Sequence, residues 1–160
     1  LVGGGPAEHN LRRTAHEAGV ADRVLFTGER PYVPDGSPGP DLPSLTSAMD
    51  VLASPCPEEA FGLAAVEALA AGLPVLYASC PAIEDRPPET TGAARQVACD
   101  TTAFARAVAS TRAHDTGPRT APEAAHHYSI TRSAAQLMDV YAAAVAASSV
   151  SPSSQGASSS

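Results

Sequence analysis

The sequence predicts an α/β protein with a doubly wound parallel sheet, and two observations lead to this fold class. Short apolar runs alternate along the chain with segments whose apolar residues recur at helical spacing. Runs such as 50–54 and 74–78 are largely apolar, which is typical of strands that helices cover on both faces. With 160 residues the chain fits one domain, which we expect to span residues 1–147.

Glycine and proline divide the first part of the chain into short elements. Gly19 is a natural end for a helix, and the stretch 30–43 is so rich in proline and glycine that we expect a loop there. In order, we expect a strand at 1–2 that runs into a glycine turn, a helix at 7–18 that buries Leu11, Ala15 and Ala18, a strand at 24–27 and a short helix near 45–49.

Strands and helices continue to alternate after residue 50. We expect strands at 50–54, 74–78 and 94–98, helices at 62–71 and 102–112, and a proline-rich loop at 81–88. Near-helical spacing predicts a long final helix at 126–147, whose buried stripe comprises Ile130, Ala134, Leu137, Met138, Tyr141 and Val145. The serine-rich segment 148–160 has no hydrophobic periodicity, so we expect a disordered tail.

The charge balance excludes some classes of partner. Acids outnumber bases, the net charge is -7, and the chain contains no lysine. Binding to nucleic acid or to an anionic membrane surface needs clustered cations, so we expect neither. A small anionic ligand is compatible with this composition, because backbone N–H groups bind phosphate without any net positive charge.

The cysteines and histidines show no pattern of a metal or disulfide site. Cys56, Cys80 and Cys99 are widely spaced and form no Cys-x-x-Cys pair, so we expect reduced thiols, a cytoplasmic location and neither a metal nor a cofactor. No apolar run approaches the roughly 20 residues that a membrane span needs, so we expect no transmembrane segment.

One carboxylate stands out on the expected helix at 62–71. Glu67 is the only charged residue between Ala60 and Leu73, on a helix that is otherwise alanine, leucine, valine and glycine. A carboxylate packed on most sides is unfavourable unless something donates hydrogen bonds to it. The diol of a ligand is one such donor. The alternative is that a backbone N–H or a distant arginine bonds to Glu67.

The loop before this helix predicts an anion site. Glu59 precedes the helix, and Phe61, Gly62 and Leu63 fall at its start. Free N–H groups and the helix dipole favour a diphosphate there, and a glycine allows the ligand to approach the backbone closely. The alternative is that Gly62 only caps the helix and that the acids are ordinary helix-start residues.

These motifs resemble those of the retaining glycosyltransferases of family 4, which use nucleotide-sugar donors on the two-domain GT-B fold. The family's signature, two glutamates separated by seven residues, is present as Glu59-Ala-Phe-Gly-Leu-Ala-Ala-Val-Glu67. The segments Val2-Gly-Gly-Gly-Pro6, Asp22-Arg-Val-Leu-Phe-Thr-Gly28, Asp50-Val-Leu-Ala-Ser-Pro55 and Glu67-Ala-Leu-Ala-Ala-Gly-Leu-Pro-Val75 match as well, and the resemblance covers about residues 1–147.

The resemblance implies roles for the residues around the expected helix. Glu67 would bind the ribose hydroxyls of the donor, and Glu59 would be the catalytic carboxylate, next to the transferred sugar. The backbone N–H groups of Phe61, Gly62 and Leu63 would hold sugar hydroxyls and the diphosphate. The expected reaction is transfer of a glycosyl group to an acceptor hydroxyl with retention, without a metal, by electrostatic stabilisation of the departing diphosphate.

The resemblance also implies roles near the N-terminus of the chain. The backbone near Arg30 and Pro31 would face the base of a UDP-, GDP- or ADP-sugar, and Gly3 and Gly4 would border the interdomain cleft. The family's basic pair that neutralises the diphosphate has no counterpart here, and the chain starts at Leu1 within a strand-like stretch. We therefore expect a donor-binding half that lacks its N-terminal acceptor domain, is inactive alone, and contacts the membrane, if at all, only peripherally through the missing domain.

Other functions fit the sequence less well. In a dinucleotide-binding Gly-x-Gly-x-x-Gly loop counted from Gly3, Glu8 would stand at the third glycine. The chain has no lysine for a phosphate-binding Walker loop and no Gly-x-Ser-x-Gly turn, and Cys56 has no placed base. The remaining alternatives are a non-catalytic nucleotide-sugar binding or interaction module and a GT-B epimerase.

Overall fold

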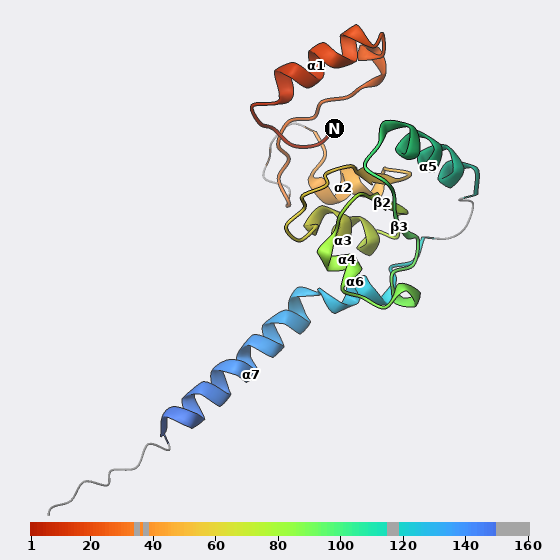
Figure 1. Ribbon diagram of the computed structural model, residues 1–160. Helices are drawn as coiled ribbons and strands as arrows, with labels where there is room; N and C mark the ends of the chain where they lie inside the picture. The colour runs from red at the N-terminus through yellow and green to blue at the C-terminus, as the bar shows by residue number, and fades with distance from the viewer. Residues whose placement is uncertain (34–35, 37–38, 115–118, 150–160) are drawn as a thin grey trace, which may run out of the picture. The chain divides into compact units, whose positions relative to one another are not determined.

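The computed structural model describes residues 1–33, 36, 39–114 and 119–149, which are drawn as ribbon in Figure 1. The chain divides into two compact units, Leu1–Asp50 and Val51–Ser160. Most of the expected tail at 148–160 lies outside the described residues. Ser148 and Ser149, however, end a helix instead of beginning a disordered segment.

The first unit contains helix α1 (Glu8–Glu17), the 3-10 turn η1 (Ala21–Arg23) and helix α2 (Leu42–Ser47). The carboxylate of Asp41 accepts a hydrogen bond of 2.8 Å from Ser44 N, which caps α2. Hydrogen bonding from the Ser44 side chain, followed by this backbone bond, lowers the pKa of Asp41. The expected buried stripe of α1 is reduced to Ala15, because Leu11 is 46% exposed and Ala18 is exposed too.

The strands expected at 1–2 and 24–27 do not form, although their backbones do pair. Leu1 N donates to Leu25 O at 2.8 Å, and Thr27 N donates to Leu1 O at 3.1 Å. Next to them, Gly3 and Gly28 form an isolated antiparallel bridge. The apolar pattern thus predicts which segments lie together, but their pairing is limited to these bonds and the glycine bridge, and no strand forms there.

The second unit is built on a three-stranded parallel sheet in the order β1-β2-β3. Leu52 of β1 pairs with Val75 of β2, and Val75 pairs with Ala94 of β3. The strands and the elements between them are β1 (Leu52–Ser54), α3 (Leu63–Ala70), β2 (Val75–Tyr77), α4 (Pro81–Glu84), η2 (Pro88–Thr90) and β3 (Ala94–Gln96).

Helices cover both faces of β2, as the doubly wound fold requires. Leu76 is 1% exposed and packs against Phe104 and Ala107 of α5 (Thr101–His114). Neighbouring strand residues face opposite sides of a sheet, so Val75 and Tyr77 face away from α5, and they are 0% and 7% exposed. Helix α3 contacts both β1 and β2. The predicted fold class is confirmed.

Three expectations after β2 are wrong. The segment 81–88 is not a plain loop, because Pro81 starts the short helix α4, and proline is favoured at the first position of a helix. The expected helix at 126–147 is two helices, α6 (Glu123–His127) and α7 (Ile130–Ser149). The expected buried stripe of α7 is exposed, and Ile130 at 86% and Val145 at 70% are examples. No described helix is long and apolar enough to span a membrane.

Candidate functional site

The start of α3 depends on a glycine. Gly62 caps the helix with φ +97°, in the left-handed region that side chains disfavour. A Cβ on residue 62 would also overlap Cys80 Sγ, which lies directly against this position. Cys80 is buried, and its thiol is directed at the carbonyls of Phe61 and Gly62, 3.6 and 3.9 Å away. Gly62 is thus required for both backbone conformation and space.

Glu59 is held against the start of α3 by its own loop. Its Oε1 accepts hydrogen bonds from Phe61 N at 3.2 Å and from Gly62 N at 3.1 Å. Two of the three N–H groups expected to face a ligand therefore bond to Glu59 in this structure. Leu63 N has no acceptor, and Glu59 Oε2 has no donor, among the described residues. Oε1 of Glu59 is thus fixed by two hydrogen bonds, and Oε2 is available to accept a hydrogen bond from a ligand.

Glu67 lies on the second turn of α3, about 6 Å along the helix axis from Leu63 at 1.5 Å per residue. Its neighbours Val66 and Ala68 are buried, while Glu67 is half-buried, so it is less enclosed than expected. No backbone N–H and no arginine among the described residues donates a hydrogen bond to its carboxylate. The carboxylate of Glu67 therefore has no hydrogen-bond donor in the part of the chain that the structure describes.

An aromatic contact supports the loop from the other side. The rings of Phe61 and Tyr128 meet edge to face with centroids 5.3 Å apart. Tyr128 donates its hydroxyl hydrogen to Ala82 O at 2.8 Å, and Ala82 N donates to Phe61 O at 3.0 Å. The end of α6 and the start of α4 together fix the position of residue 61.

Sequence reasoning missed this support, and it missed Cys80. A lone cysteine and a tyrosine ahead of a helix carry no signal that places them against residues 61 and 62. Cys80 N also donates to Glu84 Oε1 at 2.7 Å. Burial is the main cause that raises the pKa of the Cys80 thiol, and the negative charges of Glu59 and Glu84 raise it further.

The other predicted site residues, Gly3, Gly4, Arg30 and Pro31, lie in the first unit. The bridge between Gly3 and Gly28 places the glycine turn beside the segment that leads to Arg30 and Pro31. Within that unit, Glu29 lies over Gly4, and Pro31 O accepts a hydrogen bond of 2.8 Å from Leu42 N. The four predicted residues near the N-terminus thus lie in one region of the first unit. The other predicted residues, Glu59, 61–63 and Glu67, lie around α3.

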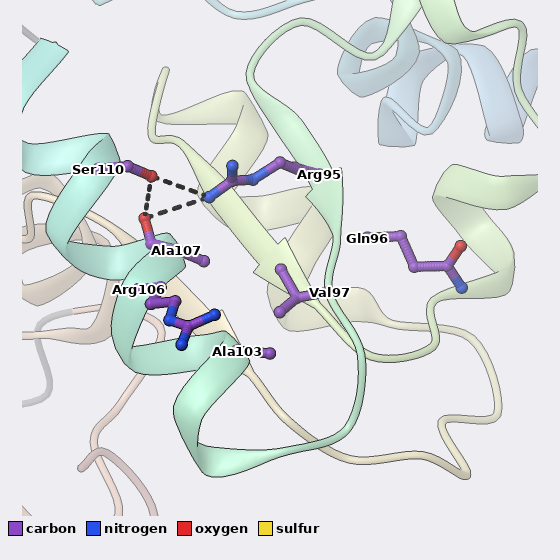
Figure 2. A pocket seen from close by; sticks show the side chains of 7 residues that line it. All are labelled: Arg95, Gln96, Val97, Ala103, Arg106, Ala107 and Ser110. Atoms are coloured by element: carbon purple, nitrogen blue, oxygen red, sulfur yellow. Dashed lines mark hydrogen bonds between the residues drawn. The ribbon is translucent and has the colours of Figure 1, made fainter.

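A cavity of about 320 Å³ lies between β3 and α5 and contains none of the predicted site residues (Figure 2). Arg95 crosses it and donates through Nη2 to Ala107 O at 3.2 Å and to Ser110 Oγ at 3.3 Å. The guanidinium of Arg95 is therefore hydrogen-bonded to α5. Among the described residues, no three His, Cys, Asp or Glu side chains are grouped as they would be to hold a metal ion.

Residues 1–113 match the family model described as "Glycosyl transferases group 1". The chain belongs to this family. The crystal structure of Anabaena HepE in complex with UDP and glucose superimposes with a TM-score of 0.64 at 25% identity, over 89% of this chain and 40% of that one. A second structure of HepE, with UDP, gives a TM-score of 0.65 at 23% identity and shows the same fold.

Curated relatives of this group 1 glycosyltransferase domain are also named as glycosyltransferases. The chain is 32% identical to D-inositol 3-phosphate glycosyltransferase of Salinispora tropica over 151 residues. This match covers 91% of this chain and 31% of that protein. The chain is 41% identical over 83 residues to the GDP-mannose-dependent alpha-(1-6)-phosphatidylinositol monomannoside mannosyltransferase of Mycobacterium tuberculosis, 48% of this chain and 20% of that protein. The chain spans a third or less of these relatives, and it is similar to the C-terminal domain of GT-B enzymes.

Proposed function

We propose that this chain is the donor-binding domain of a retaining glycosyltransferase, which transfers a sugar from a nucleoside diphosphate to an acceptor hydroxyl. The observation that carries the proposal is the half-buried carboxylate of Glu67, which has no donor among the described residues and lies on the helix whose start faces Glu59. Membership of the family, a GDP-mannose-dependent relative and a UDP-bound structural neighbour support it.

Glu67 would hold the ribose of the donor. Two adjacent hydroxyls of a ribose donate to the two oxygens of one carboxylate, and such charge-assisted bonds are stronger than neutral ones. They would satisfy a carboxylate that no described group of the chain satisfies. The ribose would then lie beside the second turn of α3, and the diphosphate would extend toward the helix start.

The start of α3 would receive the diphosphate. Leu63 N is a free donor there, and the N-terminal end of the helix carries about half a positive charge. The N–H groups of Phe61 and Gly62 already bond to Glu59, so their role is to orient that carboxylate. This modifies the expectation that all three N–H groups hold the donor.

Glu59 would contact the transferred sugar. With Oε1 fixed by two backbone N–H groups, Oε2 is left to accept from a sugar hydroxyl near the anomeric carbon. The negative charge would also stabilise the positive charge that develops on the sugar as the diphosphate leaves. No metal or cofactor enters this scheme.

Residues 1–160 would bind a donor without transferring its sugar. The chain has no lysine, and among the described residues no cationic side chain is bonded at the start of α3 to neutralise a departing diphosphate. Those groups and the acceptor site would come from the rest of a full-length enzyme, as the short coverage of the relatives suggests. The free thiols of Cys56, Cys80 and Cys99 suit a reducing compartment such as the cytoplasm.

The test is a calorimetric titration of the folded chain with UDP-, GDP- and ADP-sugars. Saturable binding of one of the three is expected, and it identifies the base. A folded chain that binds none of them contradicts the proposal. Retention is tested in a full-length enzyme with this domain, where NMR should show that the first-formed product keeps the anomeric configuration of the donor.

A further inference from the structure

A second cavity, of about 230 Å³, lies where η2 meets the junction of α6 and α7. Arg86 and Thr90 line one side, and Glu123, His126, His127 and Arg132 line the other. Liquid water occupies roughly 30 Å³ per molecule, so the space admits a small polyatomic anion together with part of its hydration shell. The proposed donor site does not include any of these residues.

The sign of charge in this cavity is opposite to that of the chain. The chain carries 10 arginines and a net charge of -7, yet two arginines and two histidines gather here around a single carboxylate. Neither arginine forms an ion pair with Glu123 among the described residues. With two arginines against one carboxylate, the local charge is therefore positive.

The two guanidinium groups keep donors available. Arg86 uses Nε to donate to the carbonyl of Asp85 at 3.1 Å, which fixes the group and leaves its terminal nitrogens without an acceptor among the described residues. The guanidinium of Arg132 has no acceptor within the described part of the chain. Such planar, forked donors match the oxygens of phosphate or carboxylate.

The two arginines also act on the imidazole of His127. Partial burial is the first cause that lowers its pKa, and the charges of Arg86 and Arg132 lower it further. Glu123 and His126 are the other titratable groups of the cavity. An anion bound between the arginines would oppose their positive charges and raise the pKa of His127.

We propose that this cavity is a binding site for a phosphate-type oxyanion, held between the guanidinium groups of Arg86 and Arg132. Two guanidinium groups and two imidazoles favour an anion with more than one charge and three or more acceptor oxygens over a carboxylate. The anion is either a free phosphate or monoester in solution, or the phosphomonoester headgroup of a lipid such as phosphatidic acid. The proposal is independent of the proposed donor site.

The site borders the support of the α3 loop. The rings of His127 and Tyr128 meet edge to face with centroids 5.0 Å apart, and Tyr128 packs in the same way on Phe61. Tyr128, which helps to position residue 61, is therefore in direct contact with the imidazole whose charge would change. Occupancy of the cavity and order in the loop can be followed in the same NMR experiment.

The test is an NMR titration of the full 160-residue chain with inorganic phosphate, following the imidazole resonances of His126 and His127. Saturable shifts and a higher pKa of His127 are expected. The double variant Arg86→Gln with Arg132→Gln should weaken the affinity by about tenfold or more, because it removes charge-assisted hydrogen bonds. Arg106→Gln, which removes a charge from the cavity between β3 and α5, is the matched control and should leave the affinity unchanged.

Vesicles distinguish the two sources of phosphate. If phosphatidic acid vesicles bind the chain through the two arginines and phosphatidylcholine vesicles do not, the anion is a headgroup; if only free phosphate binds, it is a soluble phosphate. The proposal is overturned if neither binds, if the pKa of His127 does not respond to phosphate in the wild-type chain, or if Arg106→Gln weakens binding as much as the double variant.

Discussion

Cys80 Sγ occupies the space that a side chain on Gly62 would need. The two residues are 18 positions apart, and the thiol lies against the backbone turn from which α3 starts. The φ of Gly62, +97°, adds a second reason for glycine at this position. The loop that presents Glu59 is thus locked by the packing of α4 against it.

Gly62→Ala should destabilise the chain by about 2–5 kcal/mol. A left-handed conformation costs about 1–2 kcal/mol at a non-glycine residue, and an extra carbon in a packed site costs about 1–3 kcal/mol more. In a Cys80→Ala background, only the conformational part should remain. Urea unfolding of the four chains forms a double-mutant cycle, and strictly additive effects would contradict the contact.

Cys80 should be the slow thiol of the folded chain. Burial raises its pKa, so less reactive thiolate is present at a given pH, whereas Cys56 and Cys99 are exposed. Raising the pH should accelerate the labelling of Cys80, because a larger fraction of its thiol is then deprotonated. Iodoacetamide labelling with mass spectrometry should show Cys80 modified last and, in urea, at a rate like the others; equal rates in the folded chain would contradict its burial.

Leu76→Ala should cost about 2–5 kcal/mol of the free energy of unfolding, because the side chain is 1% exposed against Phe104 and Ala107. Leu137→Ala in α7 is the matched control. Its side chain is 49% exposed, so we expect a change within about 0.5 kcal/mol. A large effect at Leu137 would mean that α7 is buried in solution.

The sequence predicted the centre of the fold well and its periphery poorly. α3 and β2 lie within the expected ranges because glycine and proline bound them and apolar periodicity fills them. The spacing of apolar residues in α7 correctly predicted a helix, but periodicity cannot state whether another element covers it. The prolines at 81–88 favour a loop, but proline also starts helices, as Pro81 does here.

The candidate site was predictable only in its local part. Glu59, Gly62 and Glu67 lie within one short segment, so their spacing places them around one helix start. Cys80 and Tyr128 reach that segment only through the tertiary fold. The use of the N–H groups of residues 61 and 62 by Glu59 depends on a side-chain conformation that no sequence pattern specifies.

Glu59→Ala should destabilise the start of α3 by about 1–2 kcal/mol, since it removes a charged acceptor from two backbone N–H groups. Glu58 is exposed and forms no such bond, so Glu58→Ala should change the stability by less than about 0.5 kcal/mol. Amide hydrogen exchange at residues 61 and 62 should accelerate in Glu59→Ala alone. Equal exchange in the two variants would show that Glu59 does not hold the loop.

The most direct test of the account is nucleotide-sugar affinity in Glu67→Ala, with Glu58→Ala as the control. Alanine is the strongest helix former, and Glu67 has no described partner in the chain, so the variant should fold normally. We predict that the donor that binds the wild-type chain loses about tenfold or more in affinity, because a carboxylate that accepts from the ribose is removed. Unchanged affinity in a folded Glu67→Ala chain would contradict the assignment of the donor site to α3.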